Sequence, residues 1–248
     1  MIVLAMLAGT VSCAWSAADK FDAGKATATI KGTVSLDGAP PKMKKIDMSG
    51  VAQCAAMHQA PVLNENVVAK DGKLANAIVY VKSVDGKKVT DVWSFDVPAT
   101  HASIDQKGCT YIPHILAVQV NQPVDIISSD DLAHNIHYIA GENKEFNESQ
   151  QKAGSKKEVT FPEPELGGKI VCNIHAWMKA YLNVFTHPFF AVTKEDGSYE
   201  IKVPPGEYEV AVWHENANDD GKLTPADAVK VKVADKESKA QDFKLKVK

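Results

Sequence analysis

The sequence lacks an excess of positive charge, and it lacks an apolar run long enough to cross a membrane. Its 28 Lys and Arg residues are balanced by 31 Asp and Glu residues, giving a net charge of −3 over 248 residues. A nucleic-acid-binding surface needs a basic face, so we expect no nucleic-acid partner. No segment approaches the ~20 consecutive apolar residues of a transmembrane helix, so we expect no membrane span.

Several catalytic motifs are also missing. The chain has no C-x-x-C-H segment for covalent haem attachment. It has no G-x-S-x-G turn and no oriented base for a hydrolase, and no His-Cys-His cluster. These absences favour a carrier or binding protein over an enzyme.

The first 18 residues differ in composition from the rest of the chain. Residues 2–15 are uncharged, and the small residues 16–18 precede Asp19 and Lys20. This pattern predicts a secretory signal peptide over residues 1–18, although no basic residue precedes the apolar run. We therefore expect export to the periplasm or cell envelope. Two alternatives stay open: a lipoprotein signal ending at Cys13, and an N-terminal element buried in the fold.

Short β-branched and aromatic runs separated by turn residues dominate the remaining sequence. Only the region 49–58 has helical character. Many short strands at intervals of about 8–12 residues predict an all-β fold built of sandwiches or barrels. The predicted strands lie at residues 26–34, 77–81, 115–120, 124–127, 159–161, 169–171, 181–185, 189–193, 199–203, 208–213, 229–233 and 243–247.

One loop after a predicted strand contains three residues suited to a soft metal. Cys172, His175 and Met178 form a C-x-x-H-x-x-M segment. A blue-copper site uses one thiolate, two imidazoles and a weak axial thioether. The second imidazole should come from a separate upstream loop, where His134 is suitably placed. Two alternatives are that these residues only fill the core and that the ion is zinc, which a thioether does not suit.

The stretch His134-Asn-Ile-His-Tyr-Ile-Ala-Gly141 and the C-x-x-H-x-x-M loop resemble the cupredoxins. The similarity covers residues 104–186 and is strongest to amicyanin-type and methylamine-utilisation-like blue copper proteins. It implies a Greek-key β-sandwich with one type 1 copper ion. The implied ligands are His134, Cys172 and His175 in the equatorial plane and Met178 on the axis.

The same resemblance assigns roles to neighbouring residues. Asn135 would join the two ligand loops by hydrogen bonds. His175 would lie nearest the surface, with Trp177 either in the core or on an apolar rim where a redox partner protein docks. Ile174 and Ala176 replace the prolines usual beside this histidine, which leaves the reduction potential open.

The expected function is therefore one-electron transfer by an exported copper protein. Two other functions remain as alternatives. The chain could store or deliver copper without redox turnover, or it could be a structural module of the cell envelope.

The two ends of the chain show a second pattern. Residues 26–98 resemble the first part of a carboxypeptidase-regulatory-like (prealbumin-like, Ig-like) sandwich, and residues 187–248 resemble its second part. We expect one split domain with the cupredoxin domain, residues 99–186, inserted into it, because insertions at loops are tolerated. The alternative is a series of separate domains.

The cysteine count predicts a disulfide. Loss of Cys13 with the signal peptide leaves three cysteines, and Cys172 is assigned to copper. In an oxidising compartment, Cys54 and Cys109 then form the remaining pair. A second metal site at His114, formed with Cys109 or His58, is the competing interpretation.

Two further motifs are weaker. His137 follows His134 by three positions, so it should point to the opposite face of a strand. Residues 216–227 have the spacing of a calcium loop, or form an acidic hairpin. The candidate calcium ligands are Asn216, Asn218, Asp220 and Asp227.

Overall fold

The computed structural model describes residues 18–139, 141–217 and 228–247. Nearly all regular structure in these ranges is strand, so the predicted all-β class is confirmed. No helix in the described ranges is long and apolar enough to cross a membrane. Residues 1–17 of the predicted signal peptide lie outside the described residues. The helical segments are η1 (Ala23–Lys25), α1 (Ala52–Ala56) and α2 (Val89–Val92).

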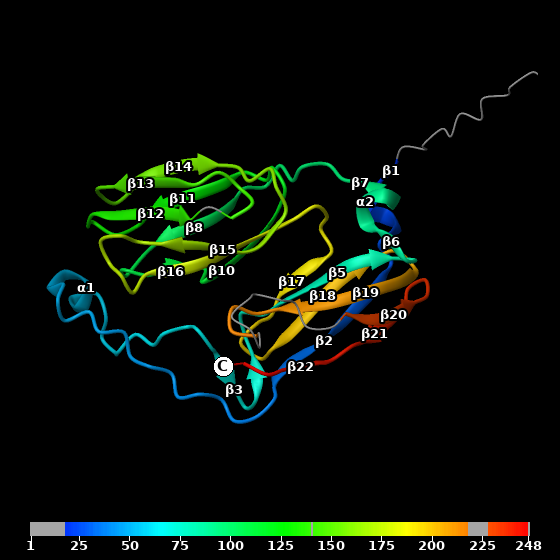
Figure 1. The fold of residues 1–248 in the computed structure, drawn as a ribbon, viewed down its shortest axis with the longest axis horizontal. Coiled ribbons are helices and arrows are strands. Elements are labelled where there is room, and N and C mark those ends of the chain that lie inside the picture. The colour runs from blue at the N-terminus through cyan, green and yellow to red at the C-terminus, as the bar shows by residue number, and fades with distance from the viewer. Residues whose placement is uncertain (1–17, 140, 218–227, 248) are drawn as a thin grey trace, which may run out of the picture.

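Two sheets from the middle of the chain face each other and form what we call the middle sandwich (Figure 1). The first sheet contains, in spatial order, β10 (Ile115–Gln119), β16 (Lys179–Phe185), β15 (Glu165–Val171), β12 (His134–Ile139) and β13 (Phe146–Gln150). The second contains β14 (Lys156–Val159), β11 (Val124–Ser128), β8 (Ala102–Gln106) and β9 (Tyr111–Ile112). The pairs β10–β16 and β8–β11 are parallel, and the other neighbours are antiparallel.

Two more sheets form what we call the end sandwich. One contains β17 (Phe190–Val192), β5 (Ile78–Val84), β19 (Gly206–Trp213) and β20 (Val229–Val233), with β6 (Lys87–Lys88) beside β5. The other contains β18 (Ser198–Val203), β2 (Ala28–Leu36), β4 (Lys73–Leu74) and β3 (Ala69–Lys70), with β21 (Ser238–Ala240) and β22 (Phe243–Leu245) beside β2. A separate short pair joins β1 (Asp19–Lys20) to β7 (Trp93–Ser94).

Strands from the two ends of the chain pair directly with each other. β2 pairs with β18 over six residues, from Ala28–Val203 to Thr33–Ser198. β5 lies between β17 and β19. These pairings support a split domain of residues 26–98 and 187–248 around residues 99–186, which we retain as a proposal.

Four strands are buried on both faces and join the sandwiches. In β10, Leu116 and Val118 enter the core of the middle sandwich, whereas Ile115 faces a separate cluster. The alternation follows from the period of two residues along a strand. The shared cluster also includes Phe185 and Trp213. The middle sandwich is thereby packed against the end sandwich through side chains of β5, β10, β16 and β19.

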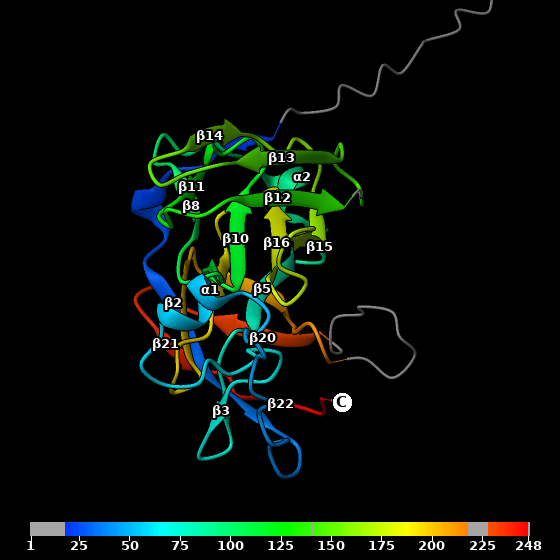
Figure 2. The same ribbon diagram turned by 90° about the vertical axis from the view of Figure 1, so that its left-hand side faces the viewer.

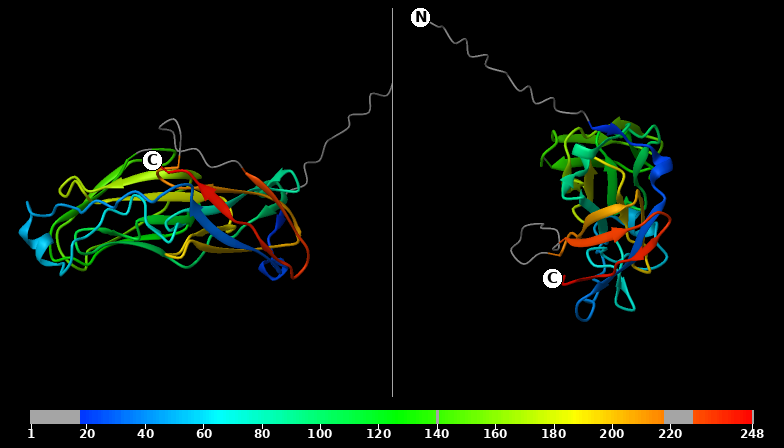
Figure 3. Two further views of the ribbon diagram at one scale, coloured as in Figure 1. Left: turned by 90° about the horizontal axis from the view of Figure 1, so that it is seen from below. Right: turned by 90° about the vertical axis from the view of Figure 1, so that its right-hand side faces the viewer.

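A long segment crosses from one sandwich to the other. Residues 37–68, which we call the strap, leave the end sandwich after β2 and return to it at β3. At its tip, α1 lies over one end of the middle sandwich, as Figure 2 shows from that side. Figure 3 shows the molecule from two further directions. In its left view, α1 lies at one end of the molecule.

The strand prediction was wrong in one set of limits, and it missed several strands. The strand expected at residues 159–161 ends instead at Val159, shortly before two prolines at 162 and 164. Strands β8, β12 and β13 were not predicted, and His134, expected on a loop, is the first residue of β12. In β13 most side chains are exposed or half-buried, so its sequence has no apolar alternation to reveal it.

Trp213 provides a test of the contact between the sandwiches. Its side chain is fully buried in the shared cluster. Within the described residues, its indole Nε1 has no hydrogen-bond partner. Trp213→Ala should therefore lower the free energy of unfolding by about 3–5 kcal/mol, as cavities from a lost aromatic ring do. Trp213→Phe, which keeps a ring and removes the unpaired N–H, should cost much less in denaturant titrations. Equal losses for the two variants would contradict this packing.

The buried imidazole of His187 should make the free energy of unfolding depend on pH. Burial lowers the pKa of its imidazole to about 4, against about 6.5 in an unfolded chain. The unfolded chain therefore binds more protons between these values, so stability is complete above pH ~6.5 and falls as the pH drops toward ~4. The loss should reach about 3 kcal/mol for this residue. In His187→Gln, whose amide oxygen can accept the Phe189 N–H now bonded to Nδ1, the fall in denaturation free energy should be shallower. An unchanged slope would refute the assignment.

Candidate metal centre

The candidate ligands come from two strands of one sheet. His134 is the first residue of β12, and Cys172 directly follows β15. His175 and Met178 lie in the turn between β15 and β16, which is closed by two backbone bonds. The Cys172 N–H donates to the Met178 carbonyl at 3.2 Å, and the Met178 N–H donates to the His175 carbonyl at 2.9 Å. The turn thus places a thiol, an imidazole and a thioether on one short, closed segment.

Three donor atoms converge at this end of the sheet. The Nδ1 atoms of His134 and His175 lie 3.0 Å apart, and His175 Nδ1 lies 3.8 Å from Cys172 Sγ. A first-row metal sits about 2.0–2.1 Å from an imidazole nitrogen and about 2.3 Å from a thiolate. Both separations can therefore be spanned by a single ion bound to all three atoms. Met178 is buried in the same core cluster as Cys172.

The pKa shifts of His134, Cys172 and His175 favour the binding of a cation. Burial lowers the pKa of His134, but hydrogen bonds to Cys172 and Asp130 outweigh it, so the pKa is raised overall. Burial raises the pKa of the Cys172 thiol, yet the hydrogen bond from His134 and nearby backbone N–H groups lower it overall. Burial and the charge of His134 lower the pKa of His175. These shifts favour the thiolate form of Cys172, the neutral form of His175 and the protonated form of His134. A metal ion can replace the proton on His134.

Asp130, which the sequence reasoning missed, fixes the orientation of His134. Its carboxylate accepts the His134 Nε2–H at 2.9 Å, which leaves Nδ1 directed at His175. The same carboxylate accepts the backbone N–H groups of Gly108 and Cys109, each at 2.7 Å. Both of these residues have positive φ, 63° and 52°. The turn before β9 is therefore shaped around a buried carboxylate that holds an imidazole by its far nitrogen.

The side chains of Asn135 and Tyr111 form hydrogen bonds that connect the two segments carrying the candidate ligands. Asn135 lies between them: its Oδ1 accepts the backbone N–H of Asn173, and its Nδ2 donates to Asn147. No role was assigned to Tyr111 from the sequence. Its hydroxyl group lies 2.6 Å from the Asn135 carbonyl and 3.0 Å from the Val171 carbonyl, and donates a shared hydrogen bond to them. Burial raises the pKa of Tyr111. These contacts hold the starting points of the two ligand segments at a fixed separation.

None of the four candidate ligands reaches the surface. His134, Cys172, His175 and Met178 are 0%, 3%, 2% and 2% exposed. Next to them, Ile174 is 52% exposed. Trp177 is half-buried, packs 5.2 Å from the His175 ring, and donates its indole N–H to the Cys109 carbonyl at 2.9 Å. His175, which we expected to lie nearest the surface, is no more exposed than Cys172 or Met178, and the Cys54 sulfur of the strap lies within 4.8 Å of its ring nitrogen.

The predicted disulfide is confirmed. Cys54 and Cys109 are bonded, whereas Cys172 is a free, buried thiol. Cys54 is the one buried residue of α1, so the disulfide attaches the tip of the strap to the middle sandwich. His58 strengthens the attachment through Nε2, which lies 2.8 Å from the Gly108 carbonyl.

The other sequence candidates lie elsewhere or make different contacts. His137 bonds to Glu145 and Asn173, and His114 forms a buried pair with Glu215. Within the described ranges, no cluster of three metal-ligating side chains includes His58, His114 or His137. Of the proposed calcium ligands, only Asn216 is described, and its side chain donates to the Asn66 carbonyl. Asn218, Asp220 and Asp227 lie outside the described residues, so calcium binding stays a prediction.

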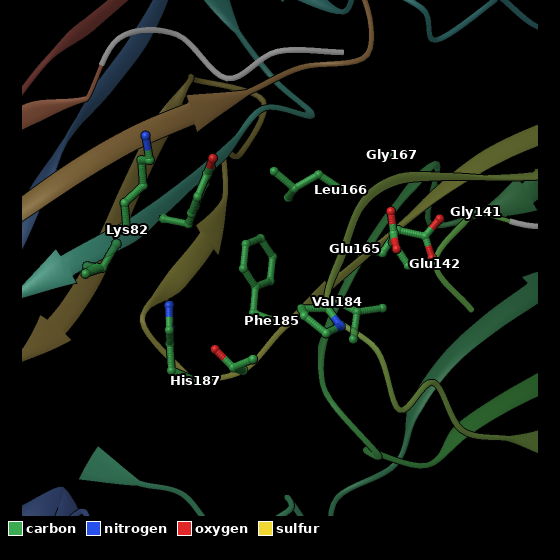
Figure 4. Close-up of a pocket in the computed structure, with 13 residues that line it drawn as sticks. Lys82, Gly141, Glu142, Glu165, Leu166, Gly167, Val184, Phe185 and His187 are labelled. Carbon is green, nitrogen blue, oxygen red and sulfur yellow. The ribbon is translucent and has the colours of Figure 1, made fainter. Parts of the chain in front are cut away.

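A cleft between the two sandwiches is separate from this centre. It has a volume of about 660 Å³, and Phe185 lies in its middle, with Lys82 and His187 on one side and Glu165 on the other (Figure 4). It contains none of the candidate ligands. We therefore place the chemistry at the end of the middle sandwich and not in this cleft.

Comparisons with known proteins give partial structural matches. No protein-family model matches the chain, and no curated protein matches it in sequence. A copper-containing nitrite reductase from Thermus scotoductus SA-01 is 18% identical over 42% of this chain, at a TM-score of 0.33. The match spans only 25% of that reductase.

Two smaller proteins match in the same way. A point mutant of amicyanin, solved in its Cu(I) form, is 23% identical over 36% of this chain and 86% of its own, with a TM-score of 0.31. A purple cupredoxin from Nitrosopumilus maritimus is 26% identical over 34% of this chain and 98% of its own, with a TM-score of 0.29. Because these scores are low, the function proposed below rests on the residues of this chain.

Asp130→Asn tests the role of the buried carboxylate. Removing its charge should lower the pKa of His134 in the metal-free protein, because the interaction that favours the imidazolium is weakened. The measurement is an NMR titration of the His134 ring. Asp131→Asn is the matched control, since Asp131 is the exposed neighbour and the change in charge is the same. Equal effects from the two substitutions would contradict a direct role for Asp130.

Proposed function

We propose that this protein binds one copper ion through His134, Cys172, His175 and Met178 and transfers single electrons. The observation that supports this most strongly is the convergence of His134 Nδ1, His175 Nδ1 and Cys172 Sγ, with separations of 3.0 and 3.8 Å. One thiolate, two imidazoles and a thioether match the ligand set of blue-copper centres. When bound, copper would supply a one-electron couple between its cuprous and cupric states.

The residues around the ligands suit such a couple. Asp130 and Tyr111 hold the ligand segments and the turn beside them through five hydrogen bonds to backbone or imidazole groups. Ligands held by the fold change position little when the charge of the ion changes, which favours rapid electron transfer. The apolar cluster around Cys172 and Met178 excludes solvent and so favours ligation by the protein side chains alone.

Burial of all four ligands also favours a second candidate function. A protein that stores or delivers copper would benefit from a strap that shields the ion, and exposures of 0–3% fit that role. The two functions differ in turnover: a carrier is reduced and reoxidised with the ion retained, whereas a delivery protein releases it. The disulfide supports export to an oxidising compartment in either case.

The visible spectrum of the copper-loaded mature protein tests the proposal. The expected result is an intense blue or green band from thiolate-to-copper charge transfer that is bleached by ascorbate and restored by ferricyanide, without loss of copper. Cys172→Ser should abolish the band because it removes the thiolate. A colourless cupric complex of the unaltered protein would refute the proposed centre, and bleaching with release of copper would favour delivery.

Two histidines of β12 provide a matched pair of variants. His134→Gln should lose the band or shift it strongly, since a ligand is removed. His137→Gln, on the same strand and bonded to Glu145, should leave the spectrum unchanged. If both variants kept the original spectrum, His134 would be excluded as a ligand.

A further inference from the structure

The strap contributes directly to the surroundings of the candidate ligands. Its own backbone is held together by hydrogen bonds from the Ile46 N–H to the Val62 carbonyl at 2.9 Å and from the Asn64 N–H to the Lys44 carbonyl at 2.8 Å. Met48 and Cys54 are buried in the core cluster that contains Cys172 and Met178. Figures 1 and 2 show α1 at the end of the sheet where β15 turns into β16. The strap is thus part of this end of the middle sandwich, although it belongs in sequence to the other sandwich.

The disulfide that fastens the strap lies against the ligand histidines. The sulfur atoms of Cys54 and Cys109 and a ring nitrogen of His175 all lie within 4.8 Å of one another. The sulfur of Cys109, a carboxylate oxygen of Asp130 and a ring nitrogen of His134 form a second such group. Together with Cys172, three sulfur atoms and two imidazoles therefore gather in one buried region.

The oxidation state of these sulfurs decides what they can bind. A disulfide has no thiolate to offer a metal. Reduction by a dithiol breaks the S–S bond, transfers two electrons and two protons to the protein, and leaves the reductant as a cyclic disulfide. Each new thiol can then lose its proton to become a thiolate ligand. Thiolates are the protein ligands that cuprous ions prefer.

We propose that reduction of the Cys54–Cys109 disulfide creates a second cuprous site, formed by Cys54, Cys109 and His175. The proposal depends on the proposed function only because it assumes that the bound ion is copper. A dithiol of the same compartment would then convert a protein that holds copper for electron transfer into one that binds cuprous ions more tightly. His175, which also faces Cys172, links the two ligand sets.

The disulfide is buried, but the segment around it is open to local separation. Cys54 is the one buried residue of the five in α1, and the other four are exposed. Short elements with few buried contacts open more readily than the core strands of the same protein. A reductant can therefore reach the disulfide when the strap separates locally, without unfolding of either sandwich.

The test uses Cys172→Ser, which removes the thiolate of the centre described above. Cuprous affinity is measured by competition with bathocuproine disulfonate, with the disulfide intact and after reduction by TCEP and anaerobic desalting. We expect the reduced variant to bind one cuprous ion at least about 100-fold more tightly than the oxidised variant, as ionised thiolates become available. Cys54→Ser/Cys109→Ser/Cys172→Ser is the control and should show no gain on treatment with TCEP. Equal affinities before and after reduction would overturn the proposal.

A further variant distinguishes a site formed by Cys54, Cys109 and His175 from binding by two unconstrained thiols in a partly unfolded protein. Adding His175→Ala to Cys172→Ser should weaken cuprous binding by the reduced protein by roughly 10-fold or more if His175 is a ligand. Tight binding that is unaffected by His175→Ala would contradict the assigned ligand set, as would loss of the β-sheet circular dichroism on reduction. The blue band of the unaltered, oxidised protein tests the electron-transfer centre separately, so failure of either idea can be recognised.

Discussion

Two imidazole nitrogens face each other at 3.0 Å inside a core that is closed to solvent, and much of the surrounding structure serves to hold them there. Neutral imidazoles with both lone pairs directed at each other would repel, so a proton or a metal ion must lie between them. Asp130 determines which nitrogen of His134 takes this position, because its carboxylate occupies the other one. Burial lowers the pKa of both rings, but hydrogen bonds to Cys172 and Asp130 raise the pKa of His134 overall, whereas the charge of His134 lowers the pKa of His175 further.

The strap explains how these polar groups come to be buried. In a sandwich, the loops at the ends of the strands normally face solvent, and a ligand loop there would be exposed. Here α1 and the disulfide lie at that end, and the exposed residues of the turn are Asn173, Ile174 and Ala176, whereas His175 is buried. The strands shared between the two cores keep the end sandwich, from which the strap departs, packed against the middle one.

The sequence was sufficient to predict the residues whose chemistry is local. Cys172, His175 and Met178 are recognisable because a single turn contains them at a spacing that suits a metal. His134 followed from the need for a second imidazole, and the Cys54–Cys109 disulfide followed from the odd number of cysteines. The all-β class followed from short β-branched runs, and the region with helical character does contain α1.

The remaining features depend on tertiary contacts that no short segment encodes. Asp130 is one of two adjacent aspartates, and only the positions of the Gly108–Cys109 turn and the His134 ring distinguish it from Asp131. Tyr111 looks like an ordinary strand residue until its hydroxyl is seen between two ligand strands. The burial of His175 could not be predicted either, because the segment that covers it lies more than a hundred residues away in the sequence.

In the proposed centre, one ion is bound by the thiolate of Cys172 and by the imidazoles of His134 and His175. X-ray absorption at the copper edge of the loaded, disulfide-intact protein measures this most directly, because it reports the atoms bound to the metal. We expect one short copper–sulfur contact and two imidazole nitrogens in both oxidation states. A shell of nitrogen and oxygen alone, with no sulfur neighbour, would contradict this ligand set.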